Sequence, residues 1–250
     1  MSKIDIDQLD ALYLAEHILR KLGLPYRSKN VEQVLKSHNS STRAAIEKIE
    51  EIENDWSFTT DDQRHSFGRK YEGEIIKLWS VPQKSAKVVE ALVALSGAKM
   101  VVEIGTSAGY AALYLAEGAK HNKGLVYTIE LLKQKSALAR EHFKLAKAKN
   151  IVLVEGEASQ SLKEWNKGTI DFVFLDADKE NYGKYLDLLL PLMKKNALIV
   201  ADNINDYGHM MEDYLQRVTG THLPNSRVDK RVRSYYLAAL DNGLMITKKL

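Results

Sequence analysis

The chain has 250 residues, of which 45% are hydrophobic and 28% charged, a composition typical of globular proteins. It contains no cysteine, which excludes disulfide bonds, thiolate metal sites and a cysteine nucleophile. No apolar run approaches the roughly 18 residues of a membrane-spanning helix, and the first residues lack the basic-then-apolar pattern of a signal peptide. We therefore expect a cytoplasmic protein without a membrane partner.

The formal net charge of +3 is unevenly distributed along the chain. Residues 1–64 hold nine lysines and arginines against twelve acids, so the remainder holds 27 basic side chains against 21 acidic ones. Scattered, solvated surface charge is the ordinary explanation of such an excess. A basic domain that faces a polyanion is the alternative.

Residues 1–80 are predicted to be helical, without strand signals. The first helix has apolar residues at helical spacing and should end at Gly23-Leu24-Pro25: Leu12, Ala15, Leu19 and Leu22. After a polar loop over 37–42, a second helix is marked by Ile46, Ile49, Ile52 and Trp56. A third apolar-faced segment runs from about Tyr71 to Trp79. We expect residues 1–80 to form a helical extension that caps the rest of the chain or mediates a homodimer.

From residue 100, short β-branched segments alternate with helical stretches. Strands are predicted over 100–104, 125–130, 151–157, 171–178 and 197–203, with helices over 110–120, 131–149, 159–166, 182–194 and 209–219. Such alternation predicts right-handed crossovers and a mostly parallel α/β sheet with helices on both faces. Two closing strands, near 226–240 and 243–248, are separated by Asp241-Asn242-Gly243, which predicts an antiparallel hairpin at one edge.

The stretch VVEIGTSAGY, residues 101–110, joins the first of these strands to the next helix. In an open α/β sheet, ligands bind beyond the carboxyl ends of the strands, beside the switch in strand order. Gly105, Thr106, Ser107 and Gly109 are small enough for a ligand to approach the backbone closely, and the next helix would present its N-terminal amides there. A tight strand-to-helix turn without a ligand explains the same residues, and this alternative stays open.

Acids and one amide end three further strands. Glu130 could accept hydrogen bonds from both hydroxyls of a ribose, or it could cap the following helix. Asp176, Asp202 and Asn203 should converge at the same sheet edge. This all-oxygen set suits Mg²⁺, with Mn²⁺ or Ca²⁺ as substitutes, whereas zinc would more usually recruit histidine or cysteine. Capping of the next helices is the alternative for these residues.

Five pieces in this order resemble a known family: VVEIGTSAGY, YTIE, VEGEA, FLDADKENY and VADN, closed by DNGLMITKK. The resemblance is to class I S-adenosylmethionine-dependent methyltransferases, and more closely to the metal-dependent catechol and caffeoyl-coenzyme A O-methyltransferases. It covers about residues 81–250 and implies a methyltransferase domain there, with a Rossmann-like sheet of seven strands. It also implies transfer of a methyl group from S-adenosylmethionine to a metal-bound hydroxyl of a catechol-like or other vicinal dihydroxy small molecule, leaving S-adenosylhomocysteine.

The resemblance also assigns cofactor contacts. Glu103 would lie under the methionine amine, beside the turn that holds Gly105, Thr106 and Ser107. Glu130 would hold the ribose hydroxyls, Ala158 would lie against the adenine, and Asp178 would reach the amino-acid end. Ala111 stands where the family commonly has serine, so one hydroxyl contact to the cofactor carboxylate is missing.

For the chemistry, the resemblance assigns Asp176, Asp202 and Asn203 to a divalent cation, and Lys179 to the role of general base. A nearby divalent cation disfavours the ammonium form of a lysine, which suits this role.

A dense basic run over 227–233 leaves a second function open. The run contains Arg227, Lys230, Arg231 and Arg233. Solvated loop charge is the ordinary explanation of this run, and recognition of coenzyme A phosphates or of a nucleic acid is the alternative. One alternative is therefore a tRNA O-methyltransferase that acts on a hydroxylated uridine. Another is a non-catalytic cofactor-binding module, against which the intact Asp176, Lys179, Asp202 and Asn203 argue.

Overall fold

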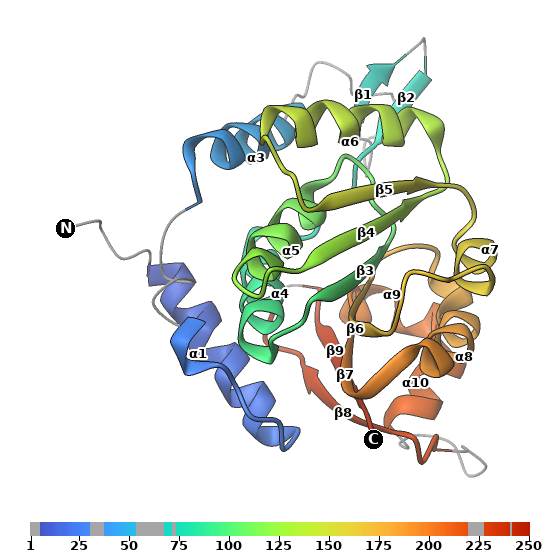
Figure 1. Cartoon of the computed structure of the whole chain (residues 1–250). Helices are drawn as coiled ribbons and strands as arrows, with labels where there is room; N and C mark the ends of the chain where they lie inside the picture. The colour runs from blue at the N-terminus through green and yellow to red at the C-terminus, as the bar shows by residue number, and fades with distance from the viewer. Residues whose placement is uncertain (1–5, 31–37, 54–67, 72–73, 220–227, 241) are drawn as a thin grey trace.

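A computed structural model of the chain describes residues 6–30, 38–53, 68–71, 74–219, 228–240 and 242–250. Its centre is a seven-stranded sheet with the strand order β5-β4-β3-β6-β7-β9-β8 (Figure 1). The strands are β3 (Met100–Ile104), β4 (Leu125–Glu130), β5 (Ile151–Glu155), β6 (Ile170–Leu175), β7 (Met193–Ala201), β8 (Val232–Leu237) and β9 (Leu244–Lys249). Strands β3 to β7 pair in parallel, and β9 is antiparallel to both β7 and β8. The predicted fold class is confirmed, including its antiparallel edge.

Helices cover both faces of this sheet, as Figure 1 shows. Alternate strand residues point to opposite faces. Val101 and Phe174 belong to the core under α4 (Gln83–Ser96), α5 (Tyr110–Lys120) and α6 (Lys133–Leu145), while Val102 and Leu175 belong to the core under the other helices. Those are α7 (Ala158–Lys163), α8 (Tyr182–Leu192) and α10 (Glu212–Thr219). Burial on both faces explains why the strand sequences are nearly continuous apolar runs.

The N-terminal helices pack against the same core. Helix α1 (Ile6–Lys21) lies on α4, and α3 (Ser40–Glu53) lies against α5 and α6. The predicted apolar residues of both helices are buried: Leu12, Ala15, Leu19, Leu22, Ile46, Ile49 and Ile52. Trp56 lies outside the described residues. Because the chain's own helices cover these apolar faces, burial of α1 and α3 does not require a second copy, and the homodimer stays a prediction.

Two segments differ from the sequence-based expectation. The segment from about Tyr71 to Trp79 was expected to be helical, but it contains β2 (Glu74–Lys77), which pairs antiparallel with β1 (Gly68–Tyr71). The expectation that residues 1–80 lack strands was therefore wrong. The helix expected over 209–219 is shorter, because α10 begins only at Glu212. The 3₁₀ turn η4 (Gly208–Met210) and a separate short helix, α9 (Ile204–Tyr207), precede it.

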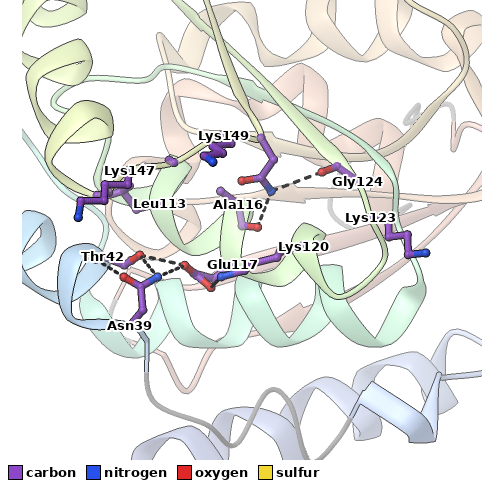
Figure 2. A pocket seen from close by; sticks show the side chains of 13 residues that line it. Asn39, Thr42, Leu113, Ala116, Glu117, Lys120, Lys123, Gly124, Lys147 and Lys149 are labelled. Atoms are coloured by element: carbon purple, nitrogen blue, oxygen red, sulfur yellow. Dashed lines mark hydrogen bonds and ion pairs between the residues drawn. The ribbon is translucent and has the colours of Figure 1, made fainter.

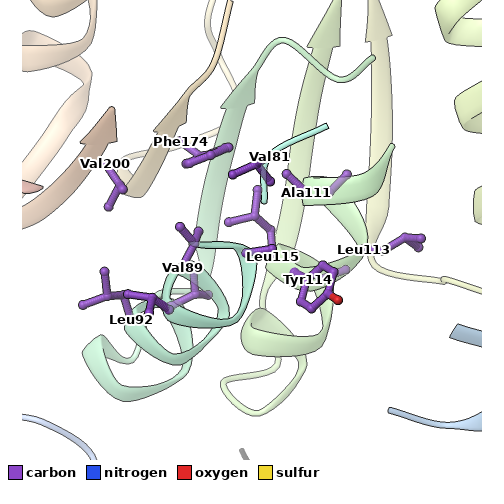
Figure 3. Close-up of a cluster of buried hydrophobic side chains, with 14 of the residues drawn as sticks. Val81, Val89, Leu92, Ala111, Leu113, Tyr114, Leu115, Phe174 and Val200 are labelled. Atoms are coloured by element: carbon purple, nitrogen blue, oxygen red, sulfur yellow. The ribbon is translucent and has the colours of Figure 1, made fainter. Parts of the chain in front are cut away.

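Helix α4 was not predicted at all. Its residues 85–95 are all buried, and Figure 3 shows Val89 and Leu92 of this helix among the buried apolar side chains. Val88, Leu92 and Leu95 recur at helical spacing, so the sequence held a signal for this helix that sequence reasoning missed. The helix begins after Pro82 and ends at Gly97, which adopts the left-handed conformation (φ 76°) typical of a helix C-terminus. Two short 3₁₀ turns, η1 (Ser28–Asn30) and η3 (Lys179–Asn181), complete the described elements. In the described part of the chain, no helix has the length and apolar character that a membrane span requires.

Candidate active site

The carboxyl ends of β3, β6 and β7 meet where the strand order reverses. From β3 the chain proceeds to β4 and β5 on one side, and β6 and β7 lie on the other side. The Asp176 N–H donates to the Ile104 carbonyl at 3.0 Å, and the Asp202 N–H donates to the Leu175 carbonyl at 3.1 Å. Gly105, Asp176 and Asp202 therefore lie at the ends of three adjacent strands, which is where ligands bind in open α/β sheets.

The two glycines of the turn after β3 are required by the protein itself. Gly105 and Gly109 have φ angles of 97° and 92°. A Cβ atom on Gly105 would lie 2.0 Å from the Asp176 carbonyl oxygen, and one on Gly109 would lie 2.5 Å from the Phe143 ring. A tight strand-to-helix turn, which was the alternative to a ligand site, therefore accounts for both glycines. A close approach of the turn to a cofactor stays a prediction.

Glu103 is completely buried and leaves one carboxyl oxygen unpaired. It lies opposite Thr128 in the pairing of β3 with β4. The Thr128 hydroxyl donates to Glu103 and so accepts from the Thr106 hydroxyl, since each hydroxyl carries one proton. The Glu103 Oε1 atom has no hydrogen-bond partner among the described residues.

Burial raises the pKa of Glu103 well above its usual value. The hydrogen bond from Thr128 opposes this shift, and the charges of Asp176 and Glu130 add to it. Buried polar atoms in proteins normally have a partner. An unpaired carboxyl oxygen at this rim therefore fits a ligand that carries an ammonium group.

Glu130 organises the same turn through backbone contacts. Its Oε2 atom accepts the Ser107 N–H at 2.8 Å, and its Oε1 atom accepts the Leu132 N–H at 2.9 Å. The Ser107 hydroxyl donates to the Leu78 carbonyl at 2.5 Å. Leu132, and not Glu130, is the N-cap residue of α6, so Glu130 does not cap that helix as the alternative expected. Each carboxylate oxygen still has a lone pair with which to accept a ribose hydroxyl.

The remaining predicted cofactor contacts lie around this rim. Ala158 is the buried first residue of α7, and its loop is held beside Glu130 because the Gly156 N–H donates to the Glu130 carbonyl at 2.8 Å. Ala111 lies in the first turn of α5 and is buried in the core. Asp178 accepts hydrogen bonds from the Tyr185 hydroxyl at 2.6 Å and from the Asn181 amide. Residues close to it in the sequence therefore fix its position.

Asp202 is a fully buried acid, and neither of its carboxyl oxygens makes a hydrogen bond of acceptable geometry within the described chain. Burial raises its pKa to about 7, and the charge of Asp176 adds to the shift. The Asn203 N–H, the charge of Lys179 and the Asn242 side chain lie near enough to oppose this shift in part. Asn203 itself precedes α9 in the left-handed conformation (φ 66°).

These residues fit a hard divalent cation. A pair of unpaired, buried carboxyl oxygens beside a second carboxylate is costly without a positive charge, and oxygen ligands are those that Mg²⁺ prefers. No group of three or more histidine, cysteine, aspartate or glutamate side chains forms a metal cluster in the described residues. A cation at this rim would therefore depend on Asp176, Asp202 and the amide oxygen of Asn203.

Lys179 follows Asp176 and is mostly buried against it. Its Nζ atom donates to the Asp176 carboxylate at 2.8 Å and to the Tyr182 hydroxyl at 3.1 Å. The Tyr182 hydroxyl in turn donates to the Leu175 carbonyl at 3.0 Å. Burial raises the pKa of Tyr182 well above its usual value, with Asp176 and Asp202 adding to the shift, so this phenol stays neutral.

Sequence reasoning missed two residues of the site. Tyr182 positions Lys179, and Thr128 links Thr106 to Glu103. Tyr182 ends the motif FLDADKENY and Thr128 lies within YTIE. Their place in these motifs was the only feature of the sequence that could have indicated a role in the site.

The basic run over 227–233 is partly neutralised in the structure. Arg227 lies outside the described residues. The Arg231 guanidinium donates to Asp229 at 2.9 and 2.6 Å, and Arg217 lies 3.7 Å from the same carboxylate. The hydrogen bond from Arg231 holds the pKa of Asp229 at about 2. This segment is therefore a mixed cluster and not a uniformly basic surface.

A model of the O-methyltransferase family matches residues 50–250 of the chain. The O-methyltransferase ankF of Aspergillus thermomutatus is 40% identical over 109 residues, which cover 42% of this chain and 46% of that protein. A catechol O-methyltransferase of Mycobacterium tuberculosis is 37% identical over 108 residues, which cover 43% of this chain and 49% of that one. The chain thus spans about half the length of these curated relatives.

Among solved structures, the O-methyltransferase from Bacillus cereus in complex with SAH has the same fold. Its TM-score is 0.66 at 20% sequence identity, over 89% of this chain and 96% of that chain.

Proposed function

The chain belongs to the O-methyltransferase family, and from this premise we propose that it transfers a methyl group from S-adenosylmethionine to a hydroxyl oxygen of a small molecule. We propose a catechol-like or other vicinal dihydroxy acceptor, because a catechol O-methyltransferase is among the relatives. One observation carries the proposal: Glu103 and Asp202, two buried acids with unpaired oxygens, lie on the same rim of the sheet.

On the donor side, Glu103 would pair its free oxygen with the ammonium group of the methionine moiety. Thr128 and Thr106 fix the orientation of this carboxyl group. Glu130 would accept the ribose hydroxyls while it continues to hold the Ser107 and Leu132 N–H groups. When S-adenosylmethionine is bound, its sulfonium supplies the methyl group.

On the acceptor side, Asp176, Asp202 and Asn203 would hold a divalent cation, with Mg²⁺ as the proposed ion. Such an ion orients a hydroxyl group and makes it more acidic. The cation would also compensate the negative charge of Asp202, because burial of this carboxyl group makes its ionised form unfavourable when no cation is bound.

Lys179 would remove the proton from the acceptor hydroxyl. Its Nζ atom is held by Asp176 and Tyr182, so the base has a fixed position beside the proposed cation ligands. The deprotonated oxygen would then bond the methyl carbon while the bond from that carbon to sulfur breaks, and the electron pair of that bond would leave with S-adenosylhomocysteine. Holding both reactants on one rim removes much of the entropic barrier to their reaction.

An acceptor screen with radiolabelled S-adenosylmethionine tests this proposal. We expect label transfer to catechols in the presence of Mg²⁺, and loss of transfer when a chelator is added. Lys179→Ala should abolish most of the transfer, whereas the control Lys184→Ala, which changes a half-exposed lysine on α8, should not. Transfer that is indifferent to chelator would refute the cation, and transfer to bulk tRNA but to no phenol would refute the small-molecule acceptor.

A further inference from the structure

A basic hollow lies at the opposite end of the sheet from the candidate active site. It has a volume of about 400 Å³ and lies beside the starts of β4 and β5, between the beginning of α3, the end of α5 and the loop after α6 (Figure 2). Four lysines line it: Lys120, Lys123, Lys147 and Lys149. Among the described residues of the lining, Glu117 is the single acid, so these side chains together carry a charge of +3.

Glu117 does not neutralise most of these lysines, because its carboxylate already has partners. It accepts the Thr42 hydroxyl at 2.9 Å, the Asn39 amide at 3.4 Å and the Lys120 ammonium at 3.1 Å. Figure 2 shows these contacts along one wall of the hollow. The other three lysines are exposed and have no ion pair within the described residues. Three unpaired like charges around one hollow repel each other unless an anion binds between them.

Two of these lysines occupy backbone positions that favour glycine. Lys123 has a φ of 56° and Lys147 a φ of 54°, each just after a helix. A side chain in this left-handed conformation is uncommon outside glycine, asparagine and aspartate. Such strain is retained where a side chain is needed, so it is a reason to look for a function of Lys123 and Lys147.

We propose that this lysine hollow binds a ligand with several phosphate groups, held by Lys123, Lys147 and Lys149. None of the lining residues that the structure describes is aromatic, so none offers a ring on which a base could stack, which favours recognition of phosphate over recognition of a nucleobase. The phosphates belong either to a free polyphosphate or to the backbone of an RNA, since lysine binds both as a point charge. This inference does not depend on the proposed methyl transfer.

Two pairs of lysine substitutions test the proposal. Lys147→Gln with Lys149→Gln removes two charges from the hollow, and Lys163→Gln with Lys167→Gln removes two exposed lysines at the end of α7 and in the loop after it. Sodium tripolyphosphate is titrated by calorimetry, and labelled bulk tRNA by fluorescence anisotropy, between about 50 and 200 mM salt.

We expect the wild type to bind at least one probe, and the hollow variant to bind it at least tenfold more weakly. The control pair should change the affinity less than twofold. For tRNA, the magnitude of the slope of log affinity against log salt should decrease by roughly 1.4 to 1.8, because the variant neutralises two fewer phosphates. Binding of tripolyphosphate identifies a free polyphosphate ligand, and binding of tRNA alone identifies the RNA backbone. Absence of binding to both probes, or equal losses in the two variants, would overturn the proposal.

A second variant separates loss of binding from loss of folding. Lys123→Gly with Lys147→Gly removes two charges at positions where glycine is conformationally at ease, so its melting temperature should equal or exceed that of the wild type. Its affinity for the phosphate probe should fall at least tenfold while its affinity for S-adenosylmethionine is unchanged. Full retention of phosphate affinity in this variant would contradict the assignment.

Discussion

Replacing Asp202 with asparagine should stabilise the ligand-free protein above neutral pH, because this carboxyl group is buried without a partner. Its pKa rises from 3.8 to about 7 on folding. A shift of about three units corresponds to ~4 kcal/mol of destabilisation when the group is ionised. The asparagine still buries an amide without good partners, which costs about 1–3 kcal/mol. The expected net gain is therefore about 1–3 kcal/mol, with roughly 2–4 °C in melting temperature for each kcal/mol.

The gain must depend on pH in a defined direction. Between pH 3.8 and about 7 the folded carboxyl group keeps a proton that the unfolded chain has lost. In this window the wild type loses about 1.4 kcal/mol of stability per pH unit from this group, and above it the loss is complete. The difference between variant and wild type should thus grow up to about pH 7 and then remain constant. Urea unfolding at about pH 5 and pH 8, with chelator present, measures it.

Equal differences at the two pH values would refute the interpretation of Asp202 as a buried, unpaired acid. Asp206→Asn, which changes an exposed acid in α9, is the matched control and should show no such pH dependence. Magnesium added at about pH 8 should raise the stability of the wild type and leave Asp202→Asn unchanged, since a ligand stabilises only the chain that binds it.

Three further predictions concern other parts of the structure. Lys179→Ala should lower the methyl transfer rate by about 10²-fold or more and leave the affinity for S-adenosylmethionine unchanged, which single-turnover kinetics and a binding titration measure. If rate and affinity fell together, the role of Lys179 would be structural. Gly105→Ala should cost about 2–5 kcal/mol of unfolding free energy, from the contact with the Asp176 carbonyl and from backbone strain. Gly156→Ala, where φ is 137° and no atom lies within 4 Å, should cost less, and equal losses in thermal unfolding would exclude the Asp176 contact as the cause. Lys248→Met should cost about 1–3 kcal/mol, because the Nζ atom donates to the Leu22 carbonyl at the end of α1 at 2.6 Å; an unchanged urea midpoint would contradict this.

The sheet could be predicted from the sequence because its strands are short apolar runs with polar residues at their ends. Glu103, Glu130 and Asp176 each stand at or near the end of such a run, so the sequence indicated the rim as well as the strands. Helix α4 was missed although the sequence held a signal for it. Apolar residues recur at helical spacing between Pro82 and Gly97, which are typical of a helix start and a helix end. The sequence does not show that Lys87 and Glu90 of this helix are buried, because their burial depends on the elements that pack against it.

The partners of individual side chains were beyond the sequence. The order of residues does not show that Thr128 lies opposite Glu103, because this pairing depends on the register of β3 against β4. The lysine hollow combines residues from Asn39 to Asn150, which meet only after α3 has packed against α5 and α6. The basic run over 227–233 is the opposite case. Its internal Asp229 was visible in the sequence, and pairing with Arg231 could have been expected from their separation of two residues.

Asp176 links the two halves of the proposed site. Burial is the main cause of the raised pKa values of Glu103 and Asp202, and the charge of Asp176 adds to both. Its carboxylate also accepts a hydrogen bond from the Lys179 Nζ atom at 2.8 Å. Its backbone carbonyl is also the group that excludes a side chain at Gly105. These relations arise because β6 lies between β3 and β7 in the sheet. Strand order therefore couples the acid assigned to the methyl donor with the acid assigned to the cation, although the two are 99 positions apart in the sequence.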